Sequence, residues 1–280
     1  MSSVFWWALD KREQKIGANG RPTHSSRLRP LDNLQNGGRN HSLCPGMTPE
    51  FLILGVIWYI VFLFSTTCHE GAHALAAKIG GDTTAFESGQ VTLNPLPHIR
   101  REPLGMVVVP ILSYAFAHWM MGWASAPYDP TWQHRHPRRA AWMALAGPGA
   151  NFSLVILSGI AIRVGMAAGY FGMPESADYT HITEAVGTGN AGFAATFLSV
   201  LFVLNLLLGT FNLLPVPPLD GNTGITLLMS EEKARAFLEW THRQGLGMLG
   251  LFLAWTLYGK IFGYIFRFSL ALLYPGSHWG

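Results

Sequence analysis

The sequence has little charge, and what excess it has lies at one end. Lys and Arg number 19 and Asp and Glu number 16, together 12% of the 280 residues, about half the usual share in soluble domains. Residues 1–50 hold seven basic and four acidic residues, whereas residues 51–280 hold twelve of each. The body therefore lacks the basic face that phosphate neutralisation requires, and we expect no nucleic-acid partner.

Cysteine is scarce as well. Cys44 and Cys68 are the two in the chain, which excludes a disulfide framework and a Cys-x-x-Cys metal site. Long apolar runs are abundant instead, and a membrane-spanning helix needs about 20 such residues. The runs cover residues 51–77, 103–126, 140–171, 191–219 and 246–273. A soluble fold of this length cannot bury five of them, so the sequence predicts an all-α polytopic protein of the lipid bilayer.

Composition divides the chain into three parts. Residues 1–46, rich in Gly, Asn, Arg and Pro, are predicted to be a disordered or non-native tail, with Met47 as the alternative start. Residues 47–230 hold the core. Residues 231–280 are predicted to form an amphipathic helix, capped by Ser230, and a C-terminal membrane segment. Lys260 and Arg267 leave open whether that segment is one span or a span followed by an interfacial helix.

The first apolar run ends in His69-Glu70-Gly71-Ala72-His73. Histidines four residues apart lie on one helical face and can bind one metal ion, and Glu70 is placed to act as a general base on water at the metal. The alternative is a polar helix end that faces water. Glu70 lies deep in an otherwise uncharged run, where an ionisable group costs about 2.5–3.5 kcal/mol, and this favours the metal site.

A third ligand is predicted at the end of the fourth run, which reads Asn-Leu-Leu-Pro-Val-Pro-Pro-Leu-Asp-Gly over residues 212–221. The prolines end the helix, and a helix broken at membrane depth is tolerated where it lines a cavity or is buried in protein. Asp220 is the acid that this break presents. An ordinary helix stop followed by a turn is the alternative reading.

These two motifs together resemble those of the site-2 proteases, the intramembrane zinc metalloproteases. Further matching segments are residues 89–96, His98-Ile99, residues 137–139 and Ala-Gly-Pro-Gly-Ala-Asn at 146–151. The resemblance covers roughly residues 50–230 and implies a short form without PDZ or CBS domains. One departure is Arg100-Arg101-Glu102-Pro103, where relatives often continue His-Ile with Asp-Pro.

The resemblance implies a site and an activity. His69, His73 and Asp220 would bind one Zn²⁺ per chain, and Glu70 would be the general base. The substrate would be the transmembrane segment of a client membrane protein, cleaved in regulated intramembrane proteolysis. The sequence fixes neither the client nor the oligomeric state.

Four further residues are candidates for substrate or oxyanion support. Asn151 and Asn212 would hold the oxyanion or the substrate backbone, with interhelical hydrogen bonds as the alternative. Val91 and Leu93 would share one face of a short strand within residues 86–93. Its edge would pair with an unwound substrate, and a plain surface hairpin is the alternative.

Two other functions are weighed against proteolysis. A zinc or other cation transporter would also bury His and acidic residues between helices, but no second ion site follows through the membrane. A pseudoprotease would bind clients without cutting them, although all four residues of the predicted site are present.

The topology follows from the shared metal. His73 and Asp220 end their runs and must lie at one depth, so an odd number of full spans must separate them. We therefore expect the run at 103–126, which Pro110 interrupts, to enter the membrane and return. The predicted core is three transmembrane helices plus this re-entrant segment, a short β segment and a further C-terminal helix. The positive-inside rule places the site toward the cytoplasm of a prokaryotic inner membrane.

Overall fold

The computed structural model describes residues 16–17, 48–187, 189–243, 245 and 247–277. Among these, four helices are long and apolar enough to cross a membrane. They are α1 (Pro49–Gly80), α6 (Pro137–Ala167), α7 (Ala191–Asn212) and α10 (Gly247–Leu273). The all-α polytopic architecture is confirmed. The tail predicted at 1–46 lies, apart from Ile16 and Gly17, outside the described residues.

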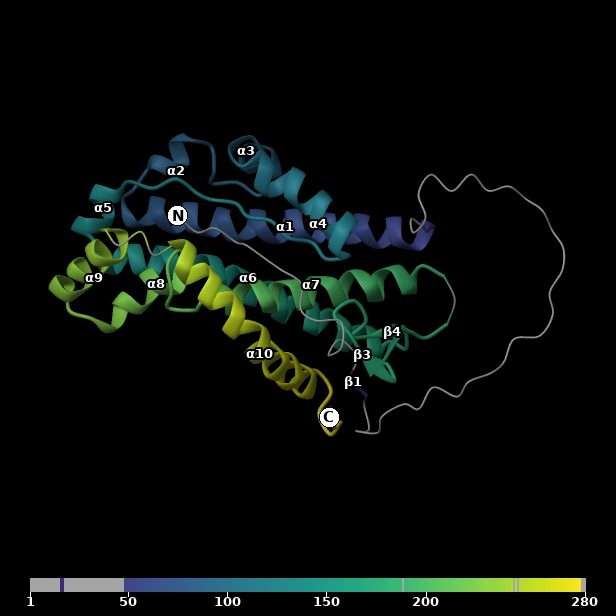
Figure 1. Ribbon diagram of the computed structural model, residues 1–280. Helices are drawn as coiled ribbons and strands as arrows, with labels where there is room; N and C mark the ends of the chain where they lie inside the picture. The colour runs from purple at the N-terminus through teal and green to yellow at the C-terminus, as the bar shows by residue number, and fades with distance from the viewer. Residues whose placement is uncertain (1–15, 18–47, 188, 244, 246, 278–280) are drawn as a thin grey trace.

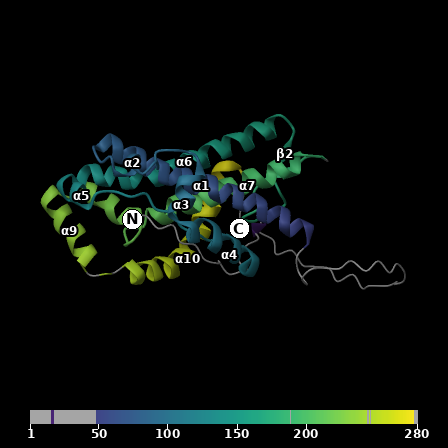
Figure 2. The same ribbon diagram turned by 90° about the horizontal axis from the view of Figure 1, so that it is seen from above.

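Helices α1, α6 and α7 lie side by side as the core of the protein (Figures 1 and 2). α7 is central, because 61% of its most apolar stretch is buried within the protein, compared with 39% for α1 and 33% for α6. Large side chains that are fully buried, such as Trp58, Phe62 and Leu204, fill the space between these helices. Exposed Ile53 and Leu157 leave an outer apolar surface suited to lipid. The bundle thus buries polar residues of α1 away from lipid.

The predicted re-entrant segment is confirmed. A π-helical turn (η2, Leu104–Val108) leads into α4 (Val109–Ala117), which ends at His118 in the left-handed region with φ 55°. The hydroxyl of Tyr114 donates to the carbonyl of Phe51 at 2.8 Å, so α4 reaches the N-terminal end of α1. Residues 119–129 then return without a helix.

The physical reason for the return differs from the expected one. Pro110 does not break the helix, because it lies in the first turn of α4, where its missing N–H costs little. The helix ends instead at His118, and the returning chain packs closely on the entering one. The N–H of Trp123 donates to the carbonyl of Gly105 at 3.1 Å, and a Cβ at Gly122 would overlap that carbonyl.

The strand predicted at 86–93 is wrong. Residues Thr84–Glu87 form a short helix, α2, and the chain then turns through Gly89 at φ 70°. Local hydrogen bonds from Ser88 to Thr84 and from Gln90 to Ala85 satisfy the backbone before a strand can form. The short β segments lie elsewhere. β2 (Phe171–Gly172) pairs with β4 (Glu184–Ala185), and β1 (Ile16–Gly17) pairs with β3 (Ser176–Ala177).

Three of the remaining helices lie at the end of the bundle where α1 finishes, and α3 (Pro95–Arg101) lies next to α4 (Figure 1). The three are α5 (Pro130–Arg135), α8 (Asp220–Gly224), which the 3₁₀ turn η3 (Ile225–Leu228) follows, and α9 (Glu231–Arg243). α9 lies where the amphipathic helix is expected. The C-terminal segment is one continuous helix, α10, through both Lys260 and Arg267.

Candidate metal centre

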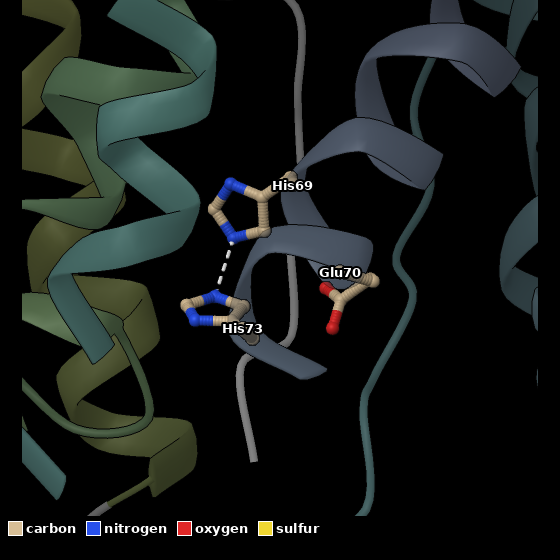
Figure 3. Close-up of side chains that lie close together, drawn as sticks. All are labelled: His69, Glu70 and His73. Atoms are coloured by element: carbon tan, nitrogen blue, oxygen red, sulfur yellow. Dashed lines mark hydrogen bonds between the residues drawn. The ribbon is translucent and has the colours of Figure 1, made fainter. Parts of the chain in front are cut away.

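The His-Glu-His motif lies near the C-terminal end of α1. Thr48 caps the helix through its side chain, which accepts from the N–H of Phe51 at 3.3 Å. His69, Glu70 and His73 are buried, with 0%, 0% and 5% of their surfaces exposed. Each offers one ligand atom within 4.8 Å of the others. Figure 3 shows the three side chains extending from neighbouring turns of the helix.

Asp220 completes the cluster. Its Oδ2 lies 3.1 Å from the Nε2 of His69 and 3.3 Å from the Nε2 of His73, and the two nitrogens are 3.0 Å apart. Ligand atoms around a tetrahedral zinc ion are separated by about 3.3 Å. The three atoms therefore already form a triangle of the size that one zinc ion requires.

The outer ring nitrogens of both histidines are held by acceptors. The Nδ1 of His69 donates to the Oδ1 of Asn151 at 2.6 Å, and the Nδ1 of His73 donates to the carbonyl of Met143 at 2.7 Å. Both acceptors fix the proton on Nδ1, so each Nε2 turns a lone pair inward. The buried Oδ2 of Asp220 accepts no hydrogen bond. Three inward lone pairs without a proton between them fit a cation.

Asp220 is placed by the broken end of α7. Successive tight turns carry the chain from Phe211 to Leu219, and Asp220 begins α8. A Cβ at Gly221 would overlap the carbonyl of Leu213, so only glycine allows this fold-back. A carboxyl that binds a metal ion does so in its ionised form.

A chain of amides supports His69 from behind. The Nδ2 of Asn151 donates to the Oδ1 of Asn205 at 2.8 Å, and the Nδ2 of Asn205 donates to the Oγ of Ser65 at 2.8 Å and to the carbonyl of Leu201. All three side chains are 0% exposed. The chain joins α6 and α7 to α1. The sequence analysis missed Asn205, although an Asn in the middle of the uncharged run of α7 was the available signal.

Helix α6 presses its backbone against the two histidines at Gly147. A Cβ there would overlap the Nε2 of His73 and lie 2.7 Å from the Cε1 of His69. Two positions further along, a Cβ at Gly149 would meet nothing within 4 Å. Glycine at 147 is therefore a steric requirement of the metal centre.

The four supporting candidates lie in different surroundings. Asn151 accepts a hydrogen bond from His69 and donates one to Asn205. These are the interhelical hydrogen bonds that the sequence analysis gave as the alternative role. The Nδ2 of Asn212 donates to the carbonyl of Leu208 at 3.0 Å, and its buried Oδ1 has no hydrogen-bond partner among the described residues. Val91 is half-buried and Leu93 is exposed.

The segment that carries Val91 and Leu93 crosses the motif helix. The carbonyl oxygen of Thr92 would lie 3.1 Å from a Cβ at Gly71, the residue after Glu70. The same carbonyl lies 3.2 Å from the Nε2 of His98, which is buried beneath the segment. The chain therefore passes directly over Gly71, the neighbour of Glu70, without forming the predicted strand.

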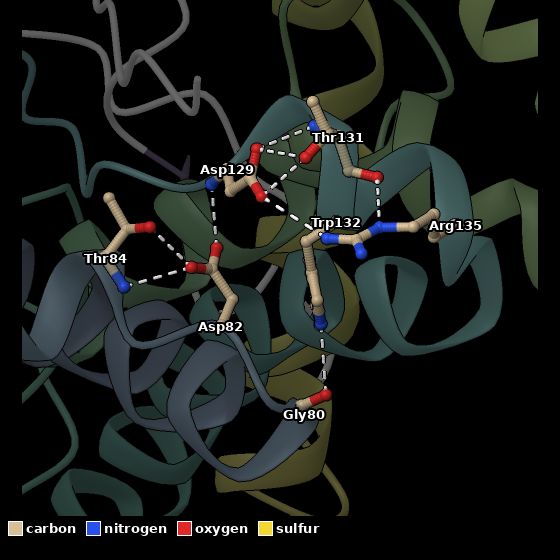
Figure 4. Close-up of polar contacts among 7 residues, drawn as sticks. All are labelled: Gly80, Asp82, Thr84, Asp129, Thr131, Trp132 and Arg135. Carbon is tan, nitrogen blue, oxygen red and sulfur yellow. Dashed lines mark hydrogen bonds and ion pairs between the residues drawn. The ribbon is translucent and has the colours of Figure 1, made fainter.

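A polar network fixes the end of α1 beyond His73 (Figure 4). The buried carboxylate of Asp82 accepts from the N–H and Oγ1 of Thr84 at 3.0 and 2.6 Å and from the N–H of Asp129 at 2.8 Å. The indole of Trp132 donates to the carbonyl of Gly80 at 3.1 Å. These bonds tie α1 to the returning chain and to α5.

A buried His-Glu-His cluster completed by a carboxylate, on helices that can cross a membrane, defines a membrane metallohydrolase. The profile of peptidase family M50 matches residues 57–257. The chain belongs to this family, which confirms the resemblance to the site-2 proteases. It is thus an integral membrane protein of a peptidase family, and zinc is the metal that the family and the site support.

Named relatives agree with this assignment. The chain is 36% identical to YwhC of Bacillus subtilis over 163 residues, which are 58% of this chain and 64% of YwhC. It is 30% identical to Rip2 of Mycobacterium tuberculosis over 205 residues, 73% of this chain and 70% of Rip2. The names of both assign them to the zinc metalloproteases. No solved structure matches the chain.

Proposed function

We propose that this protein hydrolyses peptide bonds within or next to transmembrane segments of client membrane proteins. One observation carries the proposal. The cluster of His69, Glu70, His73 and Asp220 is buried inside a bundle of apolar helices, with its first three members on α1 itself. A protease whose motif lies on a spanning helix is suited to substrates that lie in the same bilayer.

The chain's own residues divide the chemistry between them. His69, His73 and Asp220 would hold zinc through the three converging atoms. When bound, zinc polarises a scissile carbonyl and makes water more acidic. A carboxylate oxygen of Glu70 lies within 4.8 Å of the histidine ligand atoms, within reach through one water. Glu70 takes the proton from the attacking water and returns it to the leaving amine.

The segment over Gly71 would receive the substrate. The backbone N–H and carbonyl groups of Val91 and Leu93 bond to no other backbone group within the described part of the chain. Leu93 is 67% exposed. A client helix must unwind to offer its carbonyls, and its freed backbone could pair with these groups as an added strand. Asn212, with its free Oδ1, is the further candidate for holding that backbone.

The test is cleavage in liposomes that contain the purified protein and a labelled single-span client. Glu70→Gln keeps the three zinc-binding side chains and removes the base, so cleavage should fall at least about a hundredfold with zinc retained. Glu87→Gln, at an exposed acid of α2, should cut normally. Wild-type rates from Glu70→Gln would refute the assigned base. Zinc flux without client cleavage by the wild type would favour the transporter, and neither activity would favour the pseudoprotease.

The zinc site would face the cytoplasm. Basic residues cluster near its end of the bundle, at Lys78, Arg135, Arg138, Arg139, Lys233, Arg235 and Arg243. The loop between α6 and α7, residues 168–190, has no Lys or Arg and carries three acids. The positive-inside rule supports this orientation, and relatives from Bacillus subtilis and Mycobacterium tuberculosis support a prokaryotic inner membrane.

A further inference from the structure

Helix α10 carries a lysine at its middle, and contacts at both helix ends set its depth. Near the start, a Cβ at Gly250 would overlap the carbonyl of Pro217, in the loop that leads to Asp220. At the end, the carbonyl of Leu273 accepts from Arg163 at 3.3 Å. Lys260 lies about 15 Å of helix from Gly250 and about 20 Å from Leu273. The four-carbon stem of lysine is shorter than either distance, so its ammonium remains at membrane depth.

Lys260 faces away from the rest of the protein. The buried side of α10 is aromatic and aliphatic, with Tyr258, Phe262, Phe266 and Leu270 at most 5% exposed. Lys260 is on the exposed side. It forms no hydrogen bond or ion pair within the part of the chain that the structure describes.

The outward line through Lys260 does not suit lipid. Thr256, Lys260, Gly263 and Arg267 follow one another at spacings of four, three and four residues, which align them on one helix face as in a coiled-coil seam. A Cβ at Gly263 would meet nothing within 4 Å, so the face is open there. Small and polar residues are typical of contacts between membrane helices, whereas lipid-facing positions are apolar.

The charge on this face has no counterpart in the spanning helices. α6, α7 and α10 contain no Asp or Glu, and α1 contains Glu50 in its first turn and Glu70 in the metal centre. A lone cation at this depth costs about 2.5–3.5 kcal/mol, and an acidic partner would offset that cost. A second copy docked through the same face would bring two lysines together, so charge disfavours it.

We propose that the line of Thr256, Lys260, Gly263 and Arg267 docks a transmembrane helix of another protein that carries an Asp or Glu near its middle. The carboxylate would pair with Lys260, and the partner backbone would approach at Gly263. The proposal concerns binding and does not depend on catalysis at the zinc site.

The test uses the full chain in phosphatidylcholine nanodiscs with a photo-crosslinking residue in place of Thr256. The probe is a synthetic span of Leu and Ala with one central Asp, and its control has Leu at that position. The Asp probe should crosslink about tenfold more than the control, a difference typical of a strong interhelical polar contact. Lys260→Met should abolish the preference. Leu157→Met, on the outer face of α6, should leave it unchanged.

Each other outcome overturns the proposal. Equal crosslinking of both probes by the protein that retains Lys260 would mean that this helix face does not recognise an acidic residue. A preference that survives Lys260→Met would place the recognition elsewhere. A preference that disappears when phosphatidylglycerol is added would mean that the Lys260 ammonium does reach the membrane surface and pairs with a lipid headgroup there. Self-crosslinking of the protein that Lys260→Met removes would identify a second copy.

Discussion

The Nδ1 of His69 donates to the Oδ1 of Asn151 across 2.6 Å, and this bond connects the metal centre to three helices at once. From Asn151 the chain of amides runs through Asn205 on α7 and returns to Ser65, four residues before His69 on α1. The imidazole is therefore oriented by its own helix through the two neighbouring helices. Partners of this kind fix the tautomer of a metal-binding histidine.

The first prediction concerns Asn205. Asn205→Leu keeps the branching and the number of heavy atoms and removes the acceptor that orients Asn151, so zinc affinity should fall about 10- to 100-fold, measured by competition with a chelator. Ser199→Ala is the matched control, because Ser199 is also a buried hydrogen-bonding residue of α7, but it donates to Ala195 and accepts from Ile182 and Thr183, none of which belongs to the chain that supports His69. That variant should keep full affinity.

A double variant distinguishes two roles for Asn205: orienting Asn151, or stabilising the helix bundle in general. If Asn205 acts through Asn151, the loss of affinity in Asn151→Ala plus Asn205→Leu should not exceed the loss in Asn151→Ala alone. Additive losses would mean that Asn205 stabilises the bundle without orienting the ligand.

The second prediction compares two glycines of one helix. Gly→Ala inside a helix ordinarily stabilises it by about 1 kcal/mol. Gly149→Ala, with open space around its Cβ, should keep zinc and raise Tm. Gly147→Ala should lose most of its zinc, because the added methyl group overlaps the Nε2 of His73. Metal analysis after purification checks both. Stoichiometric zinc in Gly147→Ala would contradict the packing of α6 on the site.

The third prediction tests the ligand set. His69→Ala and Asp220→Ala should each lower zinc well below one ion per chain, since two ligands on a tetrahedral ion bind far more weakly than three. His134→Ala is the control, because His134 is exposed and pairs with Glu239 at 2.8 Å. Full zinc occupancy in a His69→Ala, His73→Ala double variant would exclude the proposed site.

The sequence predicted the features that follow from the length of its apolar runs and from the free-energy cost of an ionisable group in lipid. Length and apolarity located the spanning helices, and the free-energy cost of placing Glu70 in lipid marked the side chains that the structure brings together with His69 and His73. The parity of the spans between His73 and Asp220 required a re-entrant segment. These inferences succeed because they rest on properties that every arrangement of the chain must satisfy.

The sequence-based predictions were wrong or incomplete where the conformation depends on particular hydrogen bonds and packing contacts. Alternation suggested a strand at 86–93, but local bonds around Thr84 and the left-handed turn at Gly89 took up the backbone first. Pro110 appeared to break a helix, whereas a π-helical turn places it in the first turn of α4. The role of Gly147 depends on a helix 74 residues away in the chain from His73, and no local pattern encodes that contact.

The last prediction concerns orientation in the membrane. The ends of α1 and α7 meet at the metal centre, so the loop of residues 168–190 lies on the opposite side. Single cysteines are placed at His134 and Glu175, both exposed, in a chain with Cys44 and Cys68 replaced. A membrane-impermeant thiol reagent applied to intact cells should label Glu175→Cys and leave His134→Cys unlabelled until the cells are broken. Basic residues are retained on the cytoplasmic side, which is the reason for this expectation. Labelling of His134→Cys alone in intact cells would place the zinc site on the outer side and reverse the topology.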